Sequence, residues 1–449
     1  MDPQLLERYG APVPRYTSYP TAPHFHPGVT AADYRAWLGE VRDGDSLSLY
    51  LHVPFCAEMC WYCGCHTKVV RRYDPIADYL TLLEREIDLV AEAIPARPRI
   101  SHVHWGGGTP TMLSPGDFLR LTERLRDRFA FDAASEMAVE IDPRGLTEDK
   151  VAALAAAGVT RASLGVQDFN PDVQAAINRL QPYGMTAEAV NALRAAGIEA
   201  INFDLMYGLP RQSLEDVLRT VDQAVALEPD RLAVFGYAHV PWMKRHQQMI
   251  DEAELPGPLE RLEQAEAAAE RLIAQGYRRI GLDHFARPDD SMTRALDAGE
   301  LRRNFQGYTT DAADHLVGFG ASAIGALPQG YLQNAVPFRA YAETIGSGEL
   351  AVARGLRLDA DDRLRRAVIE RLMCDFAVDL DNLTMAEVGP QTDFATELEE
   401  LAPLAEDGLI RLDGRRIAVT KRGQPFVRAV CARFDSYLGA SEARHSRAV

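Results

Sequence analysis

Six short apolar runs alternate with amphipathic segments in the central part of this chain. They cover residues 48–53, 100–105, 137–141, 162–166, 201–206 and 232–237. The segments between them carry helix start and stop signals, such as Ser114 before Pro115 and Gly158 eleven residues after Thr147. Apolar strands joined by helices are typical of a parallel sheet that is buried on both faces. Six units are too few to close an eight-stranded barrel, so we expect a partial (βα)6 barrel with its catalytic residues at the carboxyl ends of the strands.

The alternation of strands and helices predicts an α/β protein, and changes in composition divide the chain into three predicted parts. Residues 1–45 are rich in Pro, Tyr and Thr and predict an arm that lies over another domain. Residues 46–355 contain the barrel and its extension. Residues 356–449 predict a mainly helical, winged-helix-like domain with a hairpin at Asp413-Gly414.

The charge and hydropathy of the chain limit its partners. A winged helix usually binds DNA, but the net charge of −17 over 449 residues argues against nucleic acid and against an anionic membrane surface. The C-terminal part is therefore expected to be a packing lid. No apolar stretch is long enough to span a bilayer, and the first residues are polar rather than a secretory signal. Free thiols fit a reducing compartment, so we expect a cytoplasmic protein without a membrane partner.

Four cysteines fall within ten residues directly after the first predicted strand. Cys56, Cys60 and Cys63 have the spacing C-x3-C-x2-C, and Cys65 follows two positions later. Three thiolates on one loop can hold three irons of a cubane [4Fe-4S] cluster and leave the fourth iron open to a small molecule. Zinc is the main alternative, although no second pair of ligands with zinc-site spacing stands out downstream.

Polar residues follow the other predicted strands at the same end as the cysteine loop. Gly107 and Gly108 end the second strand, Glu140 lies near the end of the third, and Gln167 and Asp204 belong to the fourth and fifth. Because the carboxyl ends of parallel strands meet at one edge, these groups should converge on one mouth. Glycine backbone suits an amino-acid head group, and carboxylates and amides accept hydrogen bonds from ribose hydroxyls. The profile fits S-adenosylmethionine (SAM).

The cysteine spacing with Tyr62 before the third cysteine, the glycine triplet and the partial barrel resemble the radical SAM superfamily. Within it, the chain is similar to the oxygen-independent coproporphyrinogen III oxidases, or coproporphyrinogen III dehydrogenases, over essentially its whole length. The matching strings are residues 15–21, 56–65, 105–111, 165–170, 204–210, 283–290 and 304–310.

This resemblance implies a set of site residues. Cys56, Cys60 and Cys63 are implied as cluster ligands, and two SAM molecules are implied as cofactors. The SAM at the cluster would contact Tyr50, Tyr62, Gly107 and Glu140. The second would contact Gly108, Thr109, Gln167, Arg179, Asp204, Ala238 and Ile324. Cys65 matches a family cysteine outside the cluster and is a candidate catalytic residue, with a merely packing thiol as the alternative.

The resemblance also implies a reaction. A reduced cluster would cleave SAM to a 5′-deoxyadenosyl radical, which takes a hydrogen from a propionate of coproporphyrinogen III. Two propionates would become vinyl groups, giving protoporphyrinogen IX in anaerobic haem biosynthesis. A low-potential reductant such as flavodoxin or ferredoxin would supply electrons, and we expect a monomer. The four carboxylates of the substrate predict cationic anchors, for which Arg15, Arg287 and Arg303 are candidates.

Two other functions remain open from the sequence. Haem-chaperone relatives share the cluster loop but, in the family picture, lack the fourth cysteine and the arm string of residues 15–20, both of which this chain has. A metal-binding or partner-binding protein without catalysis is the second alternative.

Overall fold

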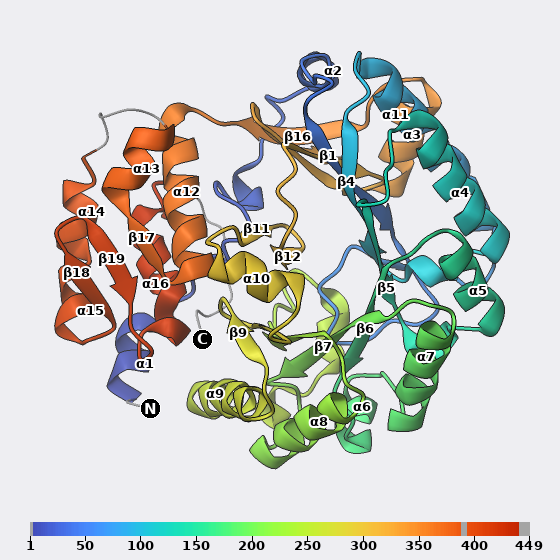
Figure 1. The fold of residues 1–449 in the computed structure, drawn as a ribbon. Coiled ribbons are helices and arrows are strands. Elements are labelled where there is room, and N and C mark those ends of the chain that lie inside the picture. Colours follow the sequence, from blue (N-terminus) through green and yellow to red (C-terminus); the bar gives the residue numbers. More distant parts are fainter. Residues whose placement is uncertain (1–2, 388–392, 440–449) are drawn as a thin grey trace.

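One large sheet organises the computed structural model, which describes residues 3–387 and 393–439 (Figure 1). From one edge to the other its strands are β16 (Val352–Arg357), β15 (Gly330–Asn334), β14 (Ile324–Leu327), β13 (His315–Phe319), β1 (Ser46–Val53), β4 (Arg99–Gly107), β5 (Glu136–Ile141), β6 (Arg161–Gln167), β7 (Ala200–Tyr207), β8 (Arg231–Gly236), β10 (His284–Ala286) and β9 (Arg278–Ile280). The six neighbouring strands β1, β4, β5, β6, β7 and β8 run parallel to one another. The predicted six-stranded parallel run of the partial barrel is confirmed.

Helices cover the outer side of this sheet (Figure 1). They are α2 (Ala31–Leu38), α3 (Asp74–Ala93), α4 (Pro115–Arg128), α5 (Glu148–Ala156), α6 (Pro171–Ala176), α7 (Tyr183–Ala195), α8 (Leu214–Ala226), α9 (Pro258–Ala274) and α11 (Phe338–Gly346). The Ser114 hydroxyl accepts a hydrogen bond from the Asp117 amide at the start of α4, as its sequence predicts. No described helix combines the length and apolar character needed to cross a membrane.

The two faces of the parallel strands differ in chemistry. Leu49, Leu51 and Val53 of β1 are buried against the core, whereas Tyr50, between them, is only half-buried. The same alternation places Glu140 of β5 and Asp204 of β7 at half-buried positions between buried apolar neighbours. Since successive side chains of a strand point to opposite faces, the inner face carries a polar row. This inner face is partly buried, and it is polar where the apolar runs predicted an apolar sheet buried on both faces.

Both edges of the sheet extend beyond the predicted strands. On one side β13 pairs in parallel with β1, and β14, β15 and β16 continue as an antiparallel extension. On the other side β10 pairs antiparallel with β8 and then with β9. Because β10 runs against its neighbour, the segment that follows it emerges at the amino ends of the parallel strands.

The arm and the C-terminal part share a separate hydrophobic core. The C-terminal part contains α12 (Ala360–Asp375), β17 (Ala377–Asp379), α13 (Leu380–Glu387), α14 (Ala395–Glu400), α15 (Ala402–Glu406), β18 (Ile410–Asp413), β19 (Arg416–Val419) and α16 (Val427–Cys431). Its three strands form a small sheet beside helices, which agrees with the winged-helix-like prediction. Leu5 and Tyr9 of α1 (Pro3–Tyr9), together with Tyr16 and Tyr19, pack into this core. The predicted boundaries at residues 45 and 355 stay a prediction.

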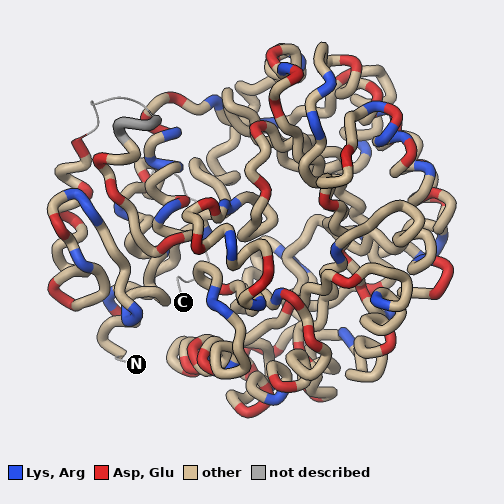
Figure 2. The backbone as a smooth tube through the Cα atoms, in the orientation of Figure 1, with Lys and Arg blue, Asp and Glu red and all other residues tan. Residues whose placement is uncertain are grey.

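Charged positions are mixed over the surface. Figure 2 shows acidic and basic residues interleaved along the outer helices and across the C-terminal part. The chain as a whole carries 65 acidic and 48 basic residues. Any region with more positive than negative side chains is therefore a local feature of this acidic chain.

A buried carboxyl fixes the turn after β13. Glu86 of α3 is 2% exposed and accepts hydrogen bonds from the Gly320 amide (2.6 Å), the Tyr341 hydroxyl (2.8 Å) and the Asn334 amide group (2.6 Å). Gly320 has φ +97°, and a Cβ there would meet the Tyr79 hydroxyl at 2.3 Å. These contacts join α3 to α11 and to the edge of the sheet that leads into β14.

Glu86 should make the stability of the protein depend on pH. Burial raises the pKa of its carboxyl to about 7, although its hydrogen bonds favour the charged form. A raised pKa in the folded state stabilises the protein fully below the unfolded value, and this stabilisation is lost as pH rises through the folded value. We therefore expect the free energy of unfolding of the wild type to fall by about 3 kcal/mol between about pH 4 and pH 8. The Glu86→Gln variant should not show this decrease.

The measurement is the melting temperature of both proteins across this pH range. Glu84→Gln is the matched control, because Glu84 lies on the same helix as Glu86 but is partly exposed and pairs with Arg120 of α4. Parallel pH profiles for the wild type and Glu86→Gln would contradict the prediction.

Candidate active site at the mouth of the barrel

The cysteine loop lies at the carboxyl end of β1, as predicted. It begins in β2 (Phe55–Cys56), which pairs with β3 (Lys68–Val69). The Trp61 amide donates to the Ile177 carbonyl (3.0 Å), which ties the middle of the loop to the end of α6. Cys60 is buried, and Cys65 is exposed. The chain itself thus holds the loop at the mouth of the barrel.

Two arginines surround the sulfur of Cys60. Arg144 Nη2 lies 3.3 Å and Arg179 Nη1 lies 3.6 Å from Cys60 Sγ. Both guanidinium groups also contact Asp142, at 2.7 and 3.2 Å, which keeps them in place. Donors of this kind are found at the ligand sulfurs of iron–sulfur sites. Arg144 was not among the predicted site residues, because an arginine after a strand carries no pattern of its own.

The other two candidate ligands also accept hydrogen bonds at sulfur. Thr109 Oγ1 lies 3.7 Å from Cys56 Sγ, and the Cys65 amide donates to Cys63 Sγ at 3.4 Å. Hydrogen bonds to ligand sulfurs are typical of iron–sulfur sites, where they tune the potential. The donor set therefore fits a thiolate-bound cluster. Among the described residues, no group of three or more His, Cys, Asp and Glu side chains is gathered closely enough to hold a single metal ion.

A segment that the sequence analysis missed holds the cysteine loop from the other side. Lys244 Nζ donates to the Cys65 carbonyl (2.9 Å), and Gln247 Nε2 donates to the Tyr62 carbonyl (2.9 Å). His246 Nε2 lies 2.7 Å from the Cys63 carbonyl oxygen. No apolar periodicity marks residues 239–250, and only their contacts reveal the role.

Glu140 connects the glycine turn to the inner face of the barrel. Its carboxylate accepts hydrogen bonds from the Gly107 amide (3.1 Å) and contacts His104 Nε2 (3.0 Å). Burial raises the pKa of Glu140, but the hydrogen bond from His104 and the Gly107 amide outweigh it and leave the pKa lowered. Gly107 has φ +109°, and a Cβ there would meet the His52 ring at 2.5 Å.

Three of the four residues predicted for the cluster-side SAM come together here. Tyr50 lies beside this group, because its ring stacks on the His104 ring with centroids 5.9 Å apart. Tyr62 lies on the cysteine loop instead, where it packs against a hydrophobic cluster that includes Val173 and Ile177.

The residues predicted for the second SAM spread over neighbouring parts of the mouth. Asp204 lines the barrel cavity together with Glu140, and burial, with the charge of Glu140, raises the pKa of Asp204 to about 7. Arg179 Nη2 donates to the Gly165 carbonyl (2.7 Å), and Gln167 adopts φ +69°. This backbone conformation is uncommon outside glycine and marks a position held by its surroundings.

The remaining residues of this set lie on both sides of the mouth. Thr109 and Gly108 follow β4, and a Cβ on Gly108 would meet the Phe55 carbonyl oxygen at 2.5 Å. Ala238 follows β8 and lines a neighbouring cavity. Ile324 begins β14, which lies two strands away from β1 in the sheet, on the other side of β13.

The structure brings together two of the three predicted anchoring arginines. Arg15 Nη2 donates to the Gly236 carbonyl (3.0 Å), and Arg303 Nη2 donates to the Arg15 carbonyl (3.3 Å). Both line a cavity of about 520 Å³ beside β8. Arg287 follows β10, and its amide donates to the Asp230 carbonyl (2.9 Å) at the amino end of β8. It therefore lies at the opposite end of the barrel, and the structure does not bring it to this cavity.

Comparisons with known proteins agree with this geometry. A family model described as the radical SAM superfamily matches residues 50–224, and one described as the HemN C-terminal domain matches residues 358–426. An oxygen-independent coproporphyrinogen III oxidase of Bradyrhizobium diazoefficiens is 53% identical, covering 100% of each chain. The relative of the same name from Escherichia coli K12 is 40% identical over 97% of this chain and 95% of its own.

A solved structure extends the similarity to the fold. The coproporphyrinogen III oxidase of Escherichia coli, described as a radical SAM enzyme, superposes with a TM-score of 0.90 at 39% identity and covers 97% of this chain and 99% of its own. Identity at this level over the whole length, with the same fold, shows the family. This chain belongs to the oxygen-independent coproporphyrinogen III oxidases of the radical SAM superfamily.

Proposed function

We propose that this chain converts two propionate side chains of coproporphyrinogen III to vinyl groups by radical-SAM oxidative decarboxylation. The product is protoporphyrinogen IX, an intermediate of anaerobic haem biosynthesis. The observation that carries the proposal is the cysteine loop at the barrel mouth, with hydrogen-bond donors on all three sulfurs, in a chain that matches named enzymes of this activity along its whole length.

The family brings a [4Fe-4S] cluster and SAM as cofactors. We propose Cys56, Cys60 and Cys63 as the cluster ligands, supported by the donors at each sulfur. When bound, the cluster and SAM supply the one-electron chemistry of the reaction. The protein positions the reactants and excludes water.

Two SAM sites are part of the proposal. The first uses Tyr50, Tyr62, Gly107 and Glu140, and the half-buried carboxylate of Glu140 supports it. The second uses Gly108, Thr109, Gln167, Arg179, Asp204, Ala238 and Ile324. Asp204 supports it, because its carboxyl opens into the same barrel cavity as Glu140 and accepts hydrogen bonds from hydroxyl groups.

The substrate is proposed to bind in the cavity beside β8. Arg15 and Arg303 line it and offer positive charge to the substrate carboxylates. We further propose that a low-potential carrier such as flavodoxin or ferredoxin supplies the electrons and that the protein acts as a monomer.

The activity is tested with anaerobically reconstituted protein, SAM, dithionite and coproporphyrinogen III. The expected products are a porphyrinogen with two vinyl groups and two molecules of CO2, measured by chromatography and mass spectrometry. Cys60→Ser is the control and should form neither. Tight haem binding without conversion of coproporphyrinogen III would contradict the proposal and favour the chaperone alternative.

Cys65 should differ from the three proposed ligands. Its side chain is not among the three with the cluster spacing, and its amide donates to Cys63 Sγ. We expect Cys65→Ser to retain the full iron content and the cubane signal in electron paramagnetic resonance. Cys56→Ser should lose most of both. An equal loss of iron in the two variants would show that Cys65 is a ligand.

Arg144 should raise the reduction potential of the cluster. Its guanidinium lies 3.3 Å from Cys60 Sγ, and a positive charge at a ligand sulfur favours the reduced cluster. Arg144→Leu is therefore expected to lower the potential by tens of millivolts in a redox titration followed by electron paramagnetic resonance. Arg211→Leu, at an arginine paired with Glu254, is the control and should leave the potential unchanged.

A further inference from the structure

The cavity beside β8 has an unusual excess of positive charge for this acidic chain. It lies between the arm, the end of β8, helix α9, the β9–β10 hairpin and helix α16 of the C-terminal part. Five arginines and two carboxylates line it, which gives three more positive than negative side chains: Arg15, Arg261, Arg279, Arg303, Arg428, Glu266 and Asp283. The net charge of the whole chain is −17, so this concentration is local.

The two carboxylates do not reverse this charge. Glu266 lies 3.6 Å from Arg279 on the wall formed by α9. Asp283 contacts His284 Nδ1 at 2.8 Å. Burial raises the pKa of Asp283, but the hydrogen bond from His284 and the charges of Arg303 and Arg15 lower it to about 2. Both acids thus belong to local pairs, and the cavity keeps its cationic character.

Arg261 is held at the end of β8 by backbone carbonyls. Its Nη2 donates to the Tyr237 carbonyl (2.7 Å), and its Nη1 lies 3.4 Å from the Gly208 carbonyl oxygen. The guanidinium also lies over the Tyr207 ring, 5.8 Å from its centroid. These contacts fix the direction in which the guanidinium group points.

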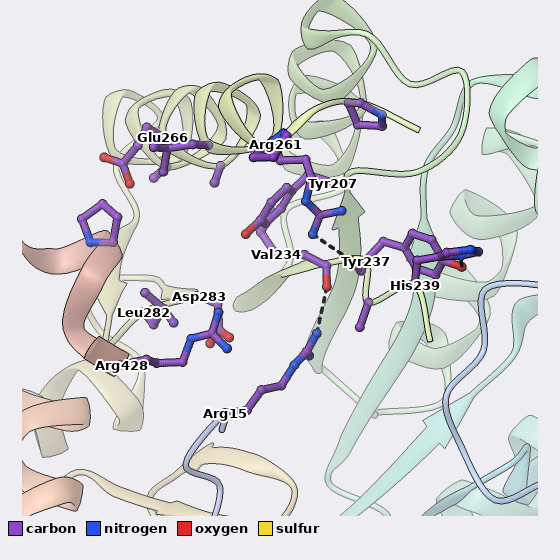
Figure 3. Close-up of a pocket in the computed structure, with 18 of the residues that line it drawn as sticks. Arg15, Tyr207, Val234, Tyr237, His239, Arg261, Glu266, Leu282, Asp283 and Arg428 are labelled. Atoms are coloured by element: carbon purple, nitrogen blue, oxygen red, sulfur yellow. Dashed lines mark hydrogen bonds between the residues drawn. The ribbon is translucent and has the colours of Figure 1, made fainter. Parts of the chain in front are cut away.

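Arg428 enters the same cavity from the C-terminal part. It is 8% exposed, and burial, together with the charges of Arg15 and Arg303, lowers its pKa to about 10. Tyr207 and Asp283 act in the opposite direction, so the group faces charges of both signs, and a further anion would stabilise this desolvated cation. Figure 3 shows Arg15, Arg261 and Arg428 reaching toward one space from the arm, the barrel and α16.

Apolar side chains complete the wall. Trp242 is 53% exposed and lines the cavity with Pro256, Pro258, Leu262 and Phe285. A ligand that fits both kinds of wall has a large apolar body with several carboxylates. Arginine groups suit carboxylates, because their forked donors match the two oxygens.

We infer that Arg261 and Arg428 form a carboxylate subsite that binds propionates of the tetrapyrrole which are not reacting. This inference rests on the proposed function and adds the C-terminal part to the substrate site. A propionate that leaves as CO2 has to be released from any ion pair, so the reacting side chain lies outside this subsite. The subsite orients the ring by its other carboxylates.

The test measures binding of coproporphyrin III, the stable oxidised form with four carboxylates, by fluorescence quenching. Arg428→Gln and Arg261→Gln are each expected to weaken binding at least about tenfold, and to raise the KM for coproporphyrinogen III. The corresponding lysine variants should recover part of the affinity. Arg433→Gln, which breaks a contact with Glu400, and Arg271→Gln, which breaks one with Asp222, are matched controls and should bind like the wild type.

A second measurement does not depend on the folding of any variant. The wild type should bind coproporphyrin III more tightly than mesoporphyrin IX, which has two carboxylates, and the difference should shrink as salt is added. Equal affinity for both porphyrins, or unchanged binding and KM in both glutamine variants, would overturn the subsite. If the two glutamine variants bind coproporphyrin III more weakly but the wild type forms no vinyl product, the proposed function is overturned and the subsite remains.

Discussion

The alternation of side chains along the parallel strands determines both the fold and the site. Leu49 and Leu51 pack outward into the helical layer, and Tyr50 between them faces the inner side with His104. The same geometry turns Glu140 and Asp204 inward. Burial of the outer row stabilises the sheet, and this rigidity holds the polar inner row in fixed positions at the mouth.

Much of this arrangement follows from the sequence, because strand order along a βα chain fixes which ends meet. The six apolar runs and the cysteine loop after the first of them lie where they were predicted. The parallel pairing of β13 with β1 could not be foreseen, because their residues are far apart in the chain and only long-range packing joins them. Arg287 was a candidate because it lies in a string shared with the family, and only the antiparallel pairing of β10 with β8 shows that it lies at the other end of the barrel from Arg15.

Contacts made by single polar side chains also could not be predicted from the sequence. Arg144, Lys244 and Gln247 reach the cysteine loop from segments without periodicity. Their importance comes from burial and distance, which appear only when the chain is folded. By contrast, the cysteines have a spacing that only a few kinds of metal site share, so they stood out in the sequence.

The packing of the arm on the C-terminal part has a consequence for the order in which the site is assembled. Tyr16 donates to Asp435 (3.0 Å), and the Tyr19 hydroxyl lies 2.9 Å from that of Ser436, so the start of the described chain is held by its end. During synthesis the cysteine loop is complete long before Arg428 leaves the ribosome. The cysteine loop can thus be in place while the cavity beside β8 still lacks a wall, and the proposed substrate site is complete only after α16 has docked.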